Sequence, residues 1–196
     1  MKDKQIGIVI LAAGESRRLG KPKQLLQFEG KTLLRHAVKV AIETNYKIAV
    51  VLGANFEKTK AEIEDLEIEI CFNENWQNGM SSSIKTGLKK ILETMPNLCA
   101  VIIQLCDQPF VNSSILKRLA ETYKRTNTPI VACEYAETVG VPALFSCVIF
   151  DELFALSADE GAKQIIKKYS ASVEKISVPE AEIDIDTMKD YEKLLS

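Results

Sequence analysis

The sequence predicts an α/β protein with a mostly parallel sheet between two layers of helices, a three-layer α/β/α arrangement. Two observations support this prediction. Short apolar runs rich in Ile and Val, which suit strands buried on both faces, alternate with longer segments of helical period. Strands that alternate with helices are joined by right-handed crossovers, and such connections leave neighbouring strands parallel.

The strand-like runs and the helical segments follow each other along the chain. Strands are expected at residues 6–11, 48–52, 68–72, 100–105 and 130–133. Apolar side chains recur at helical spacing within residues 33–42, 84–92 and 115–123. After Tyr135 the motif GVPALF is followed by helical patterns near 147–156 and 160–169, a strand near 173–178 and a last helix from about Thr187. We interpret residues 1–196 as one domain with an inserted lid-like region at about 135–180, because no repeat or linker-like stretch divides the chain.

Charge and cysteine content exclude several classes of protein. The net charge of −2 argues against nucleic-acid binding and against a polybasic membrane anchor. The five cysteines form no CxxC pair and suit neither a disulfide framework nor a zinc site, so we expect a reducing cytoplasm. No apolar stretch approaches the length of a membrane span. The charge is nevertheless uneven, because residues 13–23 carry a net +3.

This basic segment lies in LAAGESRRLGKPKQLL, residues 11–26, directly after the first expected strand. Small residues leave backbone N–H groups accessible, and cationic side chains suit phosphate oxygens, so the loop is a candidate polyphosphate cradle. It is not a P-loop, because five residues separate Gly14 from Gly20 and Pro22 follows Lys21. No GxGxxG dinucleotide motif is present. A solvated basic loop is the alternative that the residues alone leave open.

Five sequence motifs of this chain, taken together, resemble those of a known protein family. Leu-Ala-Ala-Gly at 11–14, Arg18-x-Gly20 and Pro22-Lys23 resemble the signature of nucleotidyltransferases with a GT-A-like α/β fold, which take a nucleoside monophosphate from an NTP. PKQLL, NENWQNGMSSSIKTGL, LCDQPFV, GVPALF and DEGAKQII resemble, in this order, the molybdenum cofactor cytidylyltransferase branch of the MobA-like NTP transferases. The resemblance covers nearly the whole chain.

The resemblance implies roles for the basic loop. The backbone there would hold the triphosphate at four successive residues, Leu11, Ala12, Ala13 and Gly14. Arg18 and Lys23 would neutralise the triphosphate and would count as catalytic together with Asp107. The chemistry agrees, because attack on the α-phosphorus builds charge that prepositioned cations stabilise.

Three aspartates are candidate ligands of Mg²⁺, the expected cofactor. Asp107 follows the expected strand at 100–105, where a carboxylate can hold Mg²⁺ or simply form a turn before Pro109. The resemblance favours the metal ligand. Asp184 and Asp186 share one side of an extended segment, and similar proteins complete the metal site there. The alternative is helix capping by Asp186 or Thr187, the latter in a capping box with Asp190.

The resemblance also assigns the nucleobase and acceptor regions. Gly79, Ser82 and Ser83 would contact the base or ribose, although serines at a helix start are also ordinary caps. The acceptor side would contain residues of two motifs, namely Gly140, Pro142, Glu160 and Gly161. Val141 and Lys163 depart from the residues that are frequent in the family, which leaves the acceptor's identity open. The only histidine, His36, is expected on the exposed face of its helix, so a Ser-His-Asp mechanism has no obvious base.

These observations predict a Mg²⁺-dependent nucleotidyltransferase that transfers CMP from CTP to a molybdopterin-type cofactor and releases pyrophosphate. One alternative is the same chemistry with GTP, or with a sugar phosphate or isoprenoid precursor as acceptor. An alternative of another class is a non-catalytic nucleotide- or pterin-binding module that delivers cofactor to a partner molybdoenzyme.

Overall fold

The computed structural model describes residues 4–136, 138–158 and 160–195. Its centre is a seven-stranded sheet with the strand order β5-β4-β1-β6-β8-β7-β9. The strands are β1 (Ile6–Ala12), β4 (Lys47–Leu52), β5 (Glu69–Phe72), β6 (Ala100–Leu105), β7 (Ile130–Tyr135), β8 (Thr138–Ser146) and β9 (Val173–Ser177). All of them run parallel except β8, which is antiparallel to both of its neighbours.

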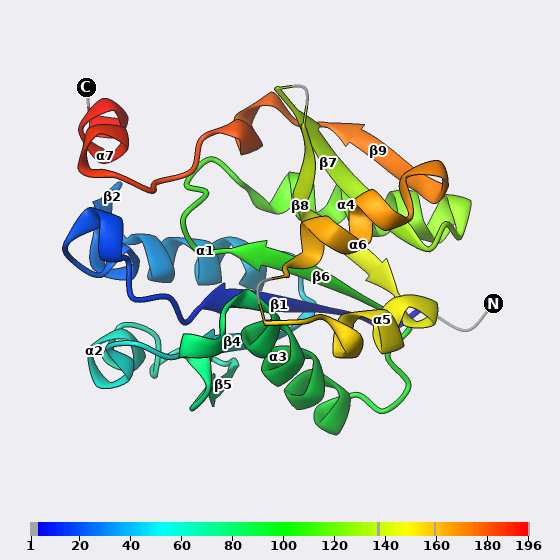
Figure 1. The fold of residues 1–196 in the computed structure, drawn as a ribbon, viewed down its shortest axis with the longest axis horizontal. Helices are drawn as coiled ribbons and strands as arrows, with labels where there is room; N and C mark the ends of the chain where they lie inside the picture. The colour runs from blue at the N-terminus through cyan, green and yellow to red at the C-terminus, as the bar shows by residue number, and fades with distance from the viewer. Residues whose placement is uncertain (1–3, 137, 159, 196) are drawn as a thin grey trace.

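Helices cover both faces of this sheet. They are α1 (Leu33–Ile42), α2 (Phe56–Ala61), α3 (Met80–Thr94), α4 (Ser113–Thr126), α5 (Phe150–Ala155), α6 (Ala162–Lys168) and α7 (Met188–Leu195). In Figure 1, α3, α5 and α6 lie in front of the sheet, and α1 and α4 lie behind it. Among the described residues, no helix is both long enough and apolar enough to cross a bilayer.

The two faces of the strands explain the three layers. On β1 the side chains of Ile8 and Ile10 point into the core with α1 and α4, whereas Val9 belongs to the core with α3, α5 and α6. Successive residues of a strand point to opposite faces, so a continuous apolar run builds two cores at once. On α3, Gly87 permits close approach to the sheet, because a Cβ there would lie 2.3 Å from Cγ1 of Val9. The predicted three-layer α/β/α fold with a mostly parallel sheet is confirmed.

The second half of the chain contributes to the same sheet. Residues 135–180, interpreted from the sequence as a lid-like region, supply strands β8 and β9. The motif GVPALF lies in β8, where Ala143, Leu144 and Phe145 are fully buried between β6 and β7. Its apolar run therefore reflects burial inside the sheet. The helical patterns expected near 147–156 and 160–169 and the strand near 173–178 do form, as α5, α6 and β9.

The expectation that His36 is solvent-exposed is wrong. The imidazole is half-buried, packs edge-on against the Phe28 ring at 5.0 Å between centroids, and has Nε2 3.0 Å from the carbonyl oxygen of Pro109. The reason is a short hairpin of β2 (Gln27–Phe28) and β3 (Lys31–Thr32), which covers this side of α1 and has no strong hydrophobic pattern. His36 thereby contacts the loop that follows β6.

Burial of His36 predicts a pH dependence of stability. Burial lowers its pKa from the ordinary 6.5, although the Pro109 carbonyl opposes this shift. The folded protein therefore favours the neutral ring, and the stabilisation is complete above about pH 6.5 and is lost as the pH falls below it. We expect urea unfolding to show a larger loss of free energy between about pH 7.5 and pH 5.5 for the wild type than for His36→Phe. Equal losses in the two proteins would show that His36 does not titrate in this way.

Candidate active site

The loop after β1 is held in place by a buried glutamine. Gln24 is fully buried, and its Nε2 donates hydrogen bonds to the carbonyl oxygens of Ala12, at 2.9 Å, and Gly14, at 2.7 Å. The Ser16 hydroxyl also accepts a hydrogen bond from the backbone N–H of Lys23 at 3.0 Å. The loop thus folds back on itself, and its basic residues start from a fixed backbone.

Asp107 reaches this loop because of the sheet order. β1 and β6 are parallel neighbours with Leu11 opposite Leu105, so the loops that follow them leave the sheet side by side. The C-terminal segment joins them, since the N–H of Ile185 donates to the carbonyl oxygen of Asp107 at 3.1 Å. Carboxyl ends of parallel strands are where α/β proteins bind ligands.

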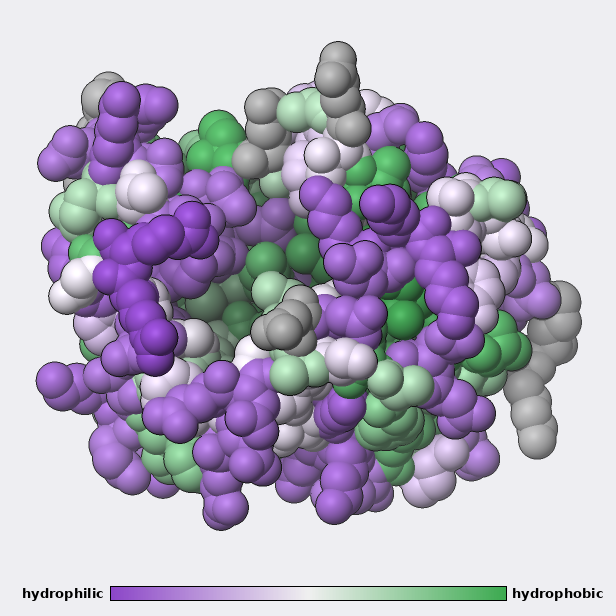
Figure 2. Space-filling view, viewed as in Figure 1, coloured by the Kyte–Doolittle hydropathy of each residue, from purple (hydrophilic) through white to green (hydrophobic). Residues whose placement is uncertain are grey.

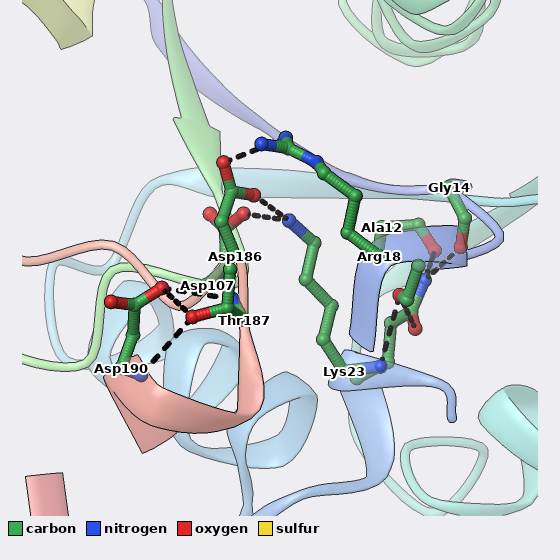
Figure 3. Close-up of polar contacts among 10 residues, drawn as sticks. Ala12, Gly14, Arg18, Lys23, Asp107, Asp186, Thr187 and Asp190 are labelled. Carbon is green, nitrogen blue, oxygen red and sulfur yellow. Dashed lines mark hydrogen bonds and ion pairs between the residues drawn. The ribbon is translucent and has the colours of Figure 1, made fainter. Parts of the chain in front are cut away.

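The start of α7 resolves the question of which residue caps the helix. The N–H of Thr187 donates to Asp190 Oδ2 at 2.8 Å, and the N–H of Asp190 donates to Thr187 Oγ1 at 3.3 Å. This reciprocal pair is a capping box. Because Thr187 is the cap, the carboxylate of Asp186 is left to face the β1 loop (Figure 3).

An ammonium group lies between two carboxylates at this meeting point. The Nζ of Lys23 contacts Asp107 Oδ2 in a short ion pair and lies 3.4 Å from Asp186 Oδ1, while Arg18 Nη2 lies 2.8 Å from Asp186 Oδ2 (Figure 3). Burial would lower the pKa of Lys23, but the Asp107 and Asp186 carboxylates outweigh it and raise this pKa. Lys23 is therefore fully charged at neutral pH.

Asp184, the third candidate metal ligand, is close enough to Asp107 and Asp186 for their charges to affect it. Burial, followed by the nearby charges of Asp107 and Asp186, raises the pKa of the Asp184 carboxyl. An additional cation close to these carboxylates would lower this pKa, since opposite charge favours the ionised form. Among the described residues, however, no group of three or more His, Cys, Asp or Glu side chains is placed to hold a metal ion. The three aspartates do not converge into a closed metal site.

The carboxylates nevertheless fit an open Mg²⁺ site. Oδ1 of Asp107 is buried and has no hydrogen-bond partner among the described residues, so this atom is available as a ligand. Asp107 and Asp186 both contact one cationic group, and both supply the oxygen ligands that Mg²⁺ prefers. Mg²⁺ usually takes one or two carboxylates and completes its octahedron with water and phosphate oxygens.

A cavity of about 230 Å³ opens beside this cluster. Most of the residues expected to bind the nucleotide line it, namely Leu11, Ala12, Ala13, Gly14, Lys23, Gly79 and Ser83, and so does the expected metal ligand Asp107. Gln24, Trp76 and Met80 also line it and were not assigned to the site from sequence. The burial of Gln24 has no sequence signal beyond its place in PKQLL. Figure 2 shows this side of the molecule hollowed, with apolar residues at the bottom of the hollow.

Two expected nucleotide residues lie elsewhere. Arg18 does not line the cavity, and its largely exposed side chain pairs with Asp186 at the rim. The Ser82 hydroxyl donates a hydrogen bond to the carbonyl oxygen of Gly79 at 2.8 Å and accepts one from Asn73 Nδ2 at 2.8 Å. These hydrogen bonds stabilise the start of α3. Gly79 has φ of +86°, and a Cβ on it would lie 2.3 Å from the Ala158 carbonyl oxygen, so only glycine fits there.

The four expected acceptor residues do not all line one pocket. Gly140 and Pro142 lie in β8, where the carbonyl oxygen of Val141 between them accepts from Gln108 Nε2 at 3.1 Å. The same amide of Gln108 donates to Ala181 at 3.0 Å and so ties the Asp107 loop to both segments. Glu160 accepts from the N–H of Ser157 at 2.7 Å. Of the four, Gly161 alone lines a separate groove of about 510 Å³ between α6, β8 and β9.

Comparison with known proteins identifies the family. A family model described as the MobA-like NTP transferase domain matches residues 8–173. The chain belongs to this family. A MobA-like NTP transferase is a nucleotidyltransferase, which confirms that class of reaction for the chain.

Individual relatives of this NTP transferase carry different names. The protein named nicotine blue oxidoreductase, from Paenarthrobacter nicotinovorans, is 26% identical over 95% of this chain and 95% of its own length. A probable molybdenum cofactor guanylyltransferase from Methanosarcina acetivorans is 30% identical, over 61% of this chain and 54% of its own. The crystal structure of Rv0371C in complex with manganese, from Mycobacterium tuberculosis H37Rv, has 29% identity and a TM-score of 0.79, with 98% of each chain covered.

The geometry of this NTP transferase suits direct displacement at phosphorus. Cys106 lines the cavity, but burial raises the pKa of its thiol to about 12, so it is a poor nucleophile at neutral pH. No histidine lines the cavity in the described part of the chain. Lys23 and Arg18 can instead hold phosphate oxygens in position, and positioning with charge neutralisation is the main requirement of phosphoryl-centre transfer.

The bracing of the β1 loop can be tested with Gln24→Leu. This change leaves the carbonyl oxygens of Ala12 and Gly14 without their amide donor, and we expect it to lower the free energy of unfolding by about 1–3 kcal/mol. Urea unfolding measures the loss, and Gln27→Leu, at an exposed position, is the matched control. A loss for Gln24→Leu no greater than that for the control would contradict the bracing role.

Proposed function

We propose that the protein is a Mg²⁺-dependent cytidylyltransferase, which transfers CMP from CTP to a molybdopterin-type cofactor and releases pyrophosphate. The observation that carries the proposal is the position of Lys23. Its ammonium group lies at the rim of the 230 Å³ cavity, between Asp107 and Asp186, beside the backbone of residues 11–14. A triphosphate in this cavity would meet a cation and backbone N–H groups on one side and metal-binding carboxylates on the other.

Each group has a distinct task in the proposed reaction. The backbone of Leu11, Ala12, Ala13 and Gly14 holds the triphosphate, and Lys23 and Arg18 neutralise it. Mg²⁺ held by Asp107 and Asp186 would stabilise charge on the phosphate oxygens and on the departing pyrophosphate. The manganese complex of Rv0371C supports a divalent metal in a similar protein. Gly79 and Ser83 line the same cavity, and we assign them to the ribose or base.

The groove beside α6 is available to bind the acceptor. Gly161 separates the cavity from the groove beside α6, since a Cβ on it would lie 2.9 Å from the sulfur of Met80, which lines the cavity. The groove contains the apolar residues Val139, Ile166 and Val173 and three lysines, Lys163, Lys167 and Lys175. An apolar floor with cationic groups favours an anionic ring-bearing acceptor. We propose that this groove, with the nearby segment from Gly140 to Pro142 and with Glu160, receives the pterin phosphate.

One observation favours a second nucleotide. The relative named as a probable molybdenum cofactor guanylyltransferase is 30% identical over 61% of this chain. GTP is therefore the second candidate donor.

Pyrophosphate release decides between these reactions. The protein is incubated with Mg²⁺ and molybdopterin-type cofactor, and CTP, GTP and ATP are compared. Release with CTP that requires the acceptor supports the proposal, and a preference for GTP replaces cytidylyl by guanylyl transfer. Release only with a sugar phosphate or an isoprenoid precursor changes the acceptor. Calorimetric binding of nucleotide without product in any mixture would support the non-catalytic module that delivers cofactor to a molybdoenzyme.

Two substitutions test the residues that carry the reaction. We expect Lys23→Ala and Asp107→Ala each to lower kcat/KM by at least about 100-fold, because each removes charge stabilisation that is needed in the transition state. Lys89→Ala, on the exposed side of α3, makes the same kind of truncation outside the site and should have no effect. Rates within a few-fold of the wild type for Lys23→Ala or Asp107→Ala would refute the site assignment.

A further inference from the structure

The residues that would hold the divalent metal already hold a cation that belongs to the chain. Lys23 contacts one carboxylate oxygen of Asp107 and one of Asp186, and Arg18 contacts the second oxygen of Asp186. A metal ion bound by Asp107 and Asp186 would need oxygens of the same two groups. The ammonium group and the metal ion would therefore share the same two carboxylates, even though Oδ1 of Asp107 has no partner among the described residues.

Because Lys23 and Asp107 are largely buried, binding Lys23 and a metal ion to the same carboxylates is energetically costly. The Lys23 side chain is 20% exposed and that of Asp107 is 7% exposed, so the charges interact with little screening by water. A divalent ion that joined the carboxylates while Lys23 stayed in place would be repelled by the ammonium charge. If Lys23 left without another anion to contact, it would lose its ion pairs, and a charged group deprived of its partner in a partly buried site is strongly unfavourable.

A polyphosphate offers Lys23 that other anion. Lys23 lines the same cavity as the backbone of Ala12 and Gly14, so its ammonium group can contact phosphate oxygens there by rotation of its own side chain. Arg18 lies on the open side of Asp186 and is mostly exposed, so it too can turn to a phosphate. Each cation that moves to the phosphates leaves carboxylate oxygens to the metal.

We propose that Lys23 competes with the divalent cation for Asp107 and Asp186, so that the protein binds the free cation weakly until a polyphosphate draws Lys23 away from the two carboxylates. This inference rests on the proposed function in that it assigns the two carboxylates to the metal. It adds the residue that controls binding of the metal.

Direct metal binding tests the competition without any turnover. Equilibrium dialysis with Mn²⁺ alone is carried out on the nucleotide-free wild type, on Lys23→Met and on Lys89→Met, which makes the same charge change on the exposed side of α3. We expect Lys23→Met to bind Mn²⁺ at least about tenfold more tightly than the wild type, because a competing positive charge has been removed. Lys89→Met should match the wild type. An unchanged or weaker affinity of Lys23→Met would overturn the proposal.

A double variant establishes where the ion binds. Adding Asp107→Asn to Lys23→Met should abolish the gain in affinity, since one of the two carboxylates is lost. A gain that survives in the double variant would place the ion elsewhere and would also overturn the proposal.

The wild type provides a second measurement that does not depend on the folding of any variant. Inorganic tripolyphosphate is the probe, because it has the phosphates of a nucleotide without base or ribose. We expect the wild type to bind the Mn²⁺–tripolyphosphate complex at least about tenfold more tightly than Mn²⁺ alone. Equal affinities would contradict the proposal. Neither measurement uses CTP or an acceptor, so a wrong nucleotide or acceptor in the proposed function would leave these results unaffected.

Discussion

The ion pairs of Lys23 hold together three parts of the chain that are remote in sequence. The ammonium group joins the loop after β1 to Asp107, 84 residues away, and to Asp186, 163 residues away. Charged groups that are partly buried are costly unless they are paired, so each partner depends on the others. The neighbouring hydrogen bonds keep these partners in position. Gln24 fixes the loop, Gln108 fixes the segment after β6, and the capping box at Thr187 turns Asp186 toward Lys23.

The sheet order determines which loops can meet. β1 and β6 are adjacent at the centre, so their carboxyl ends deliver the basic loop and Asp107 to the same place. On one side of this pair lies β4, and α3 lines the 230 Å³ cavity through Met80 and Ser83. On the other side, the antiparallel β8 separates β6 from β7 and β9, and α6 packs over that part of the sheet. The fold thus offers two neighbouring hollows, which suits an enzyme that must bring a nucleotide and an acceptor together.

The distribution of charged residues is more informative in this protein than its net charge. The net charge of −2 conceals a basic loop and three aspartates that the fold brings together. The cavity contains no histidine among its described residues, and its Cys106 thiol is protonated at neutral pH. The charged groups beside the cavity are therefore its main chemical resource. Lys23 is central among them, since it contacts the carboxylates of both Asp107 and Asp186.

The sequence by itself determined the fold class and most of the residues that line the 230 Å³ cavity. Buried parallel strands read as continuous apolar runs, and the loop after such a strand is an established place for ligands, so residues 11–14, Lys23 and Asp107 could be found from local pattern and family resemblance. Tertiary structure decided the rest. The burial of His36 and Gln24, the capping of α7 by Thr187 and the place of GVPALF inside the sheet all depend on contacts between distant segments. A local pattern records which side chains are apolar or charged, whereas the partner that each of them meets is set only when the strands take their order in the sheet.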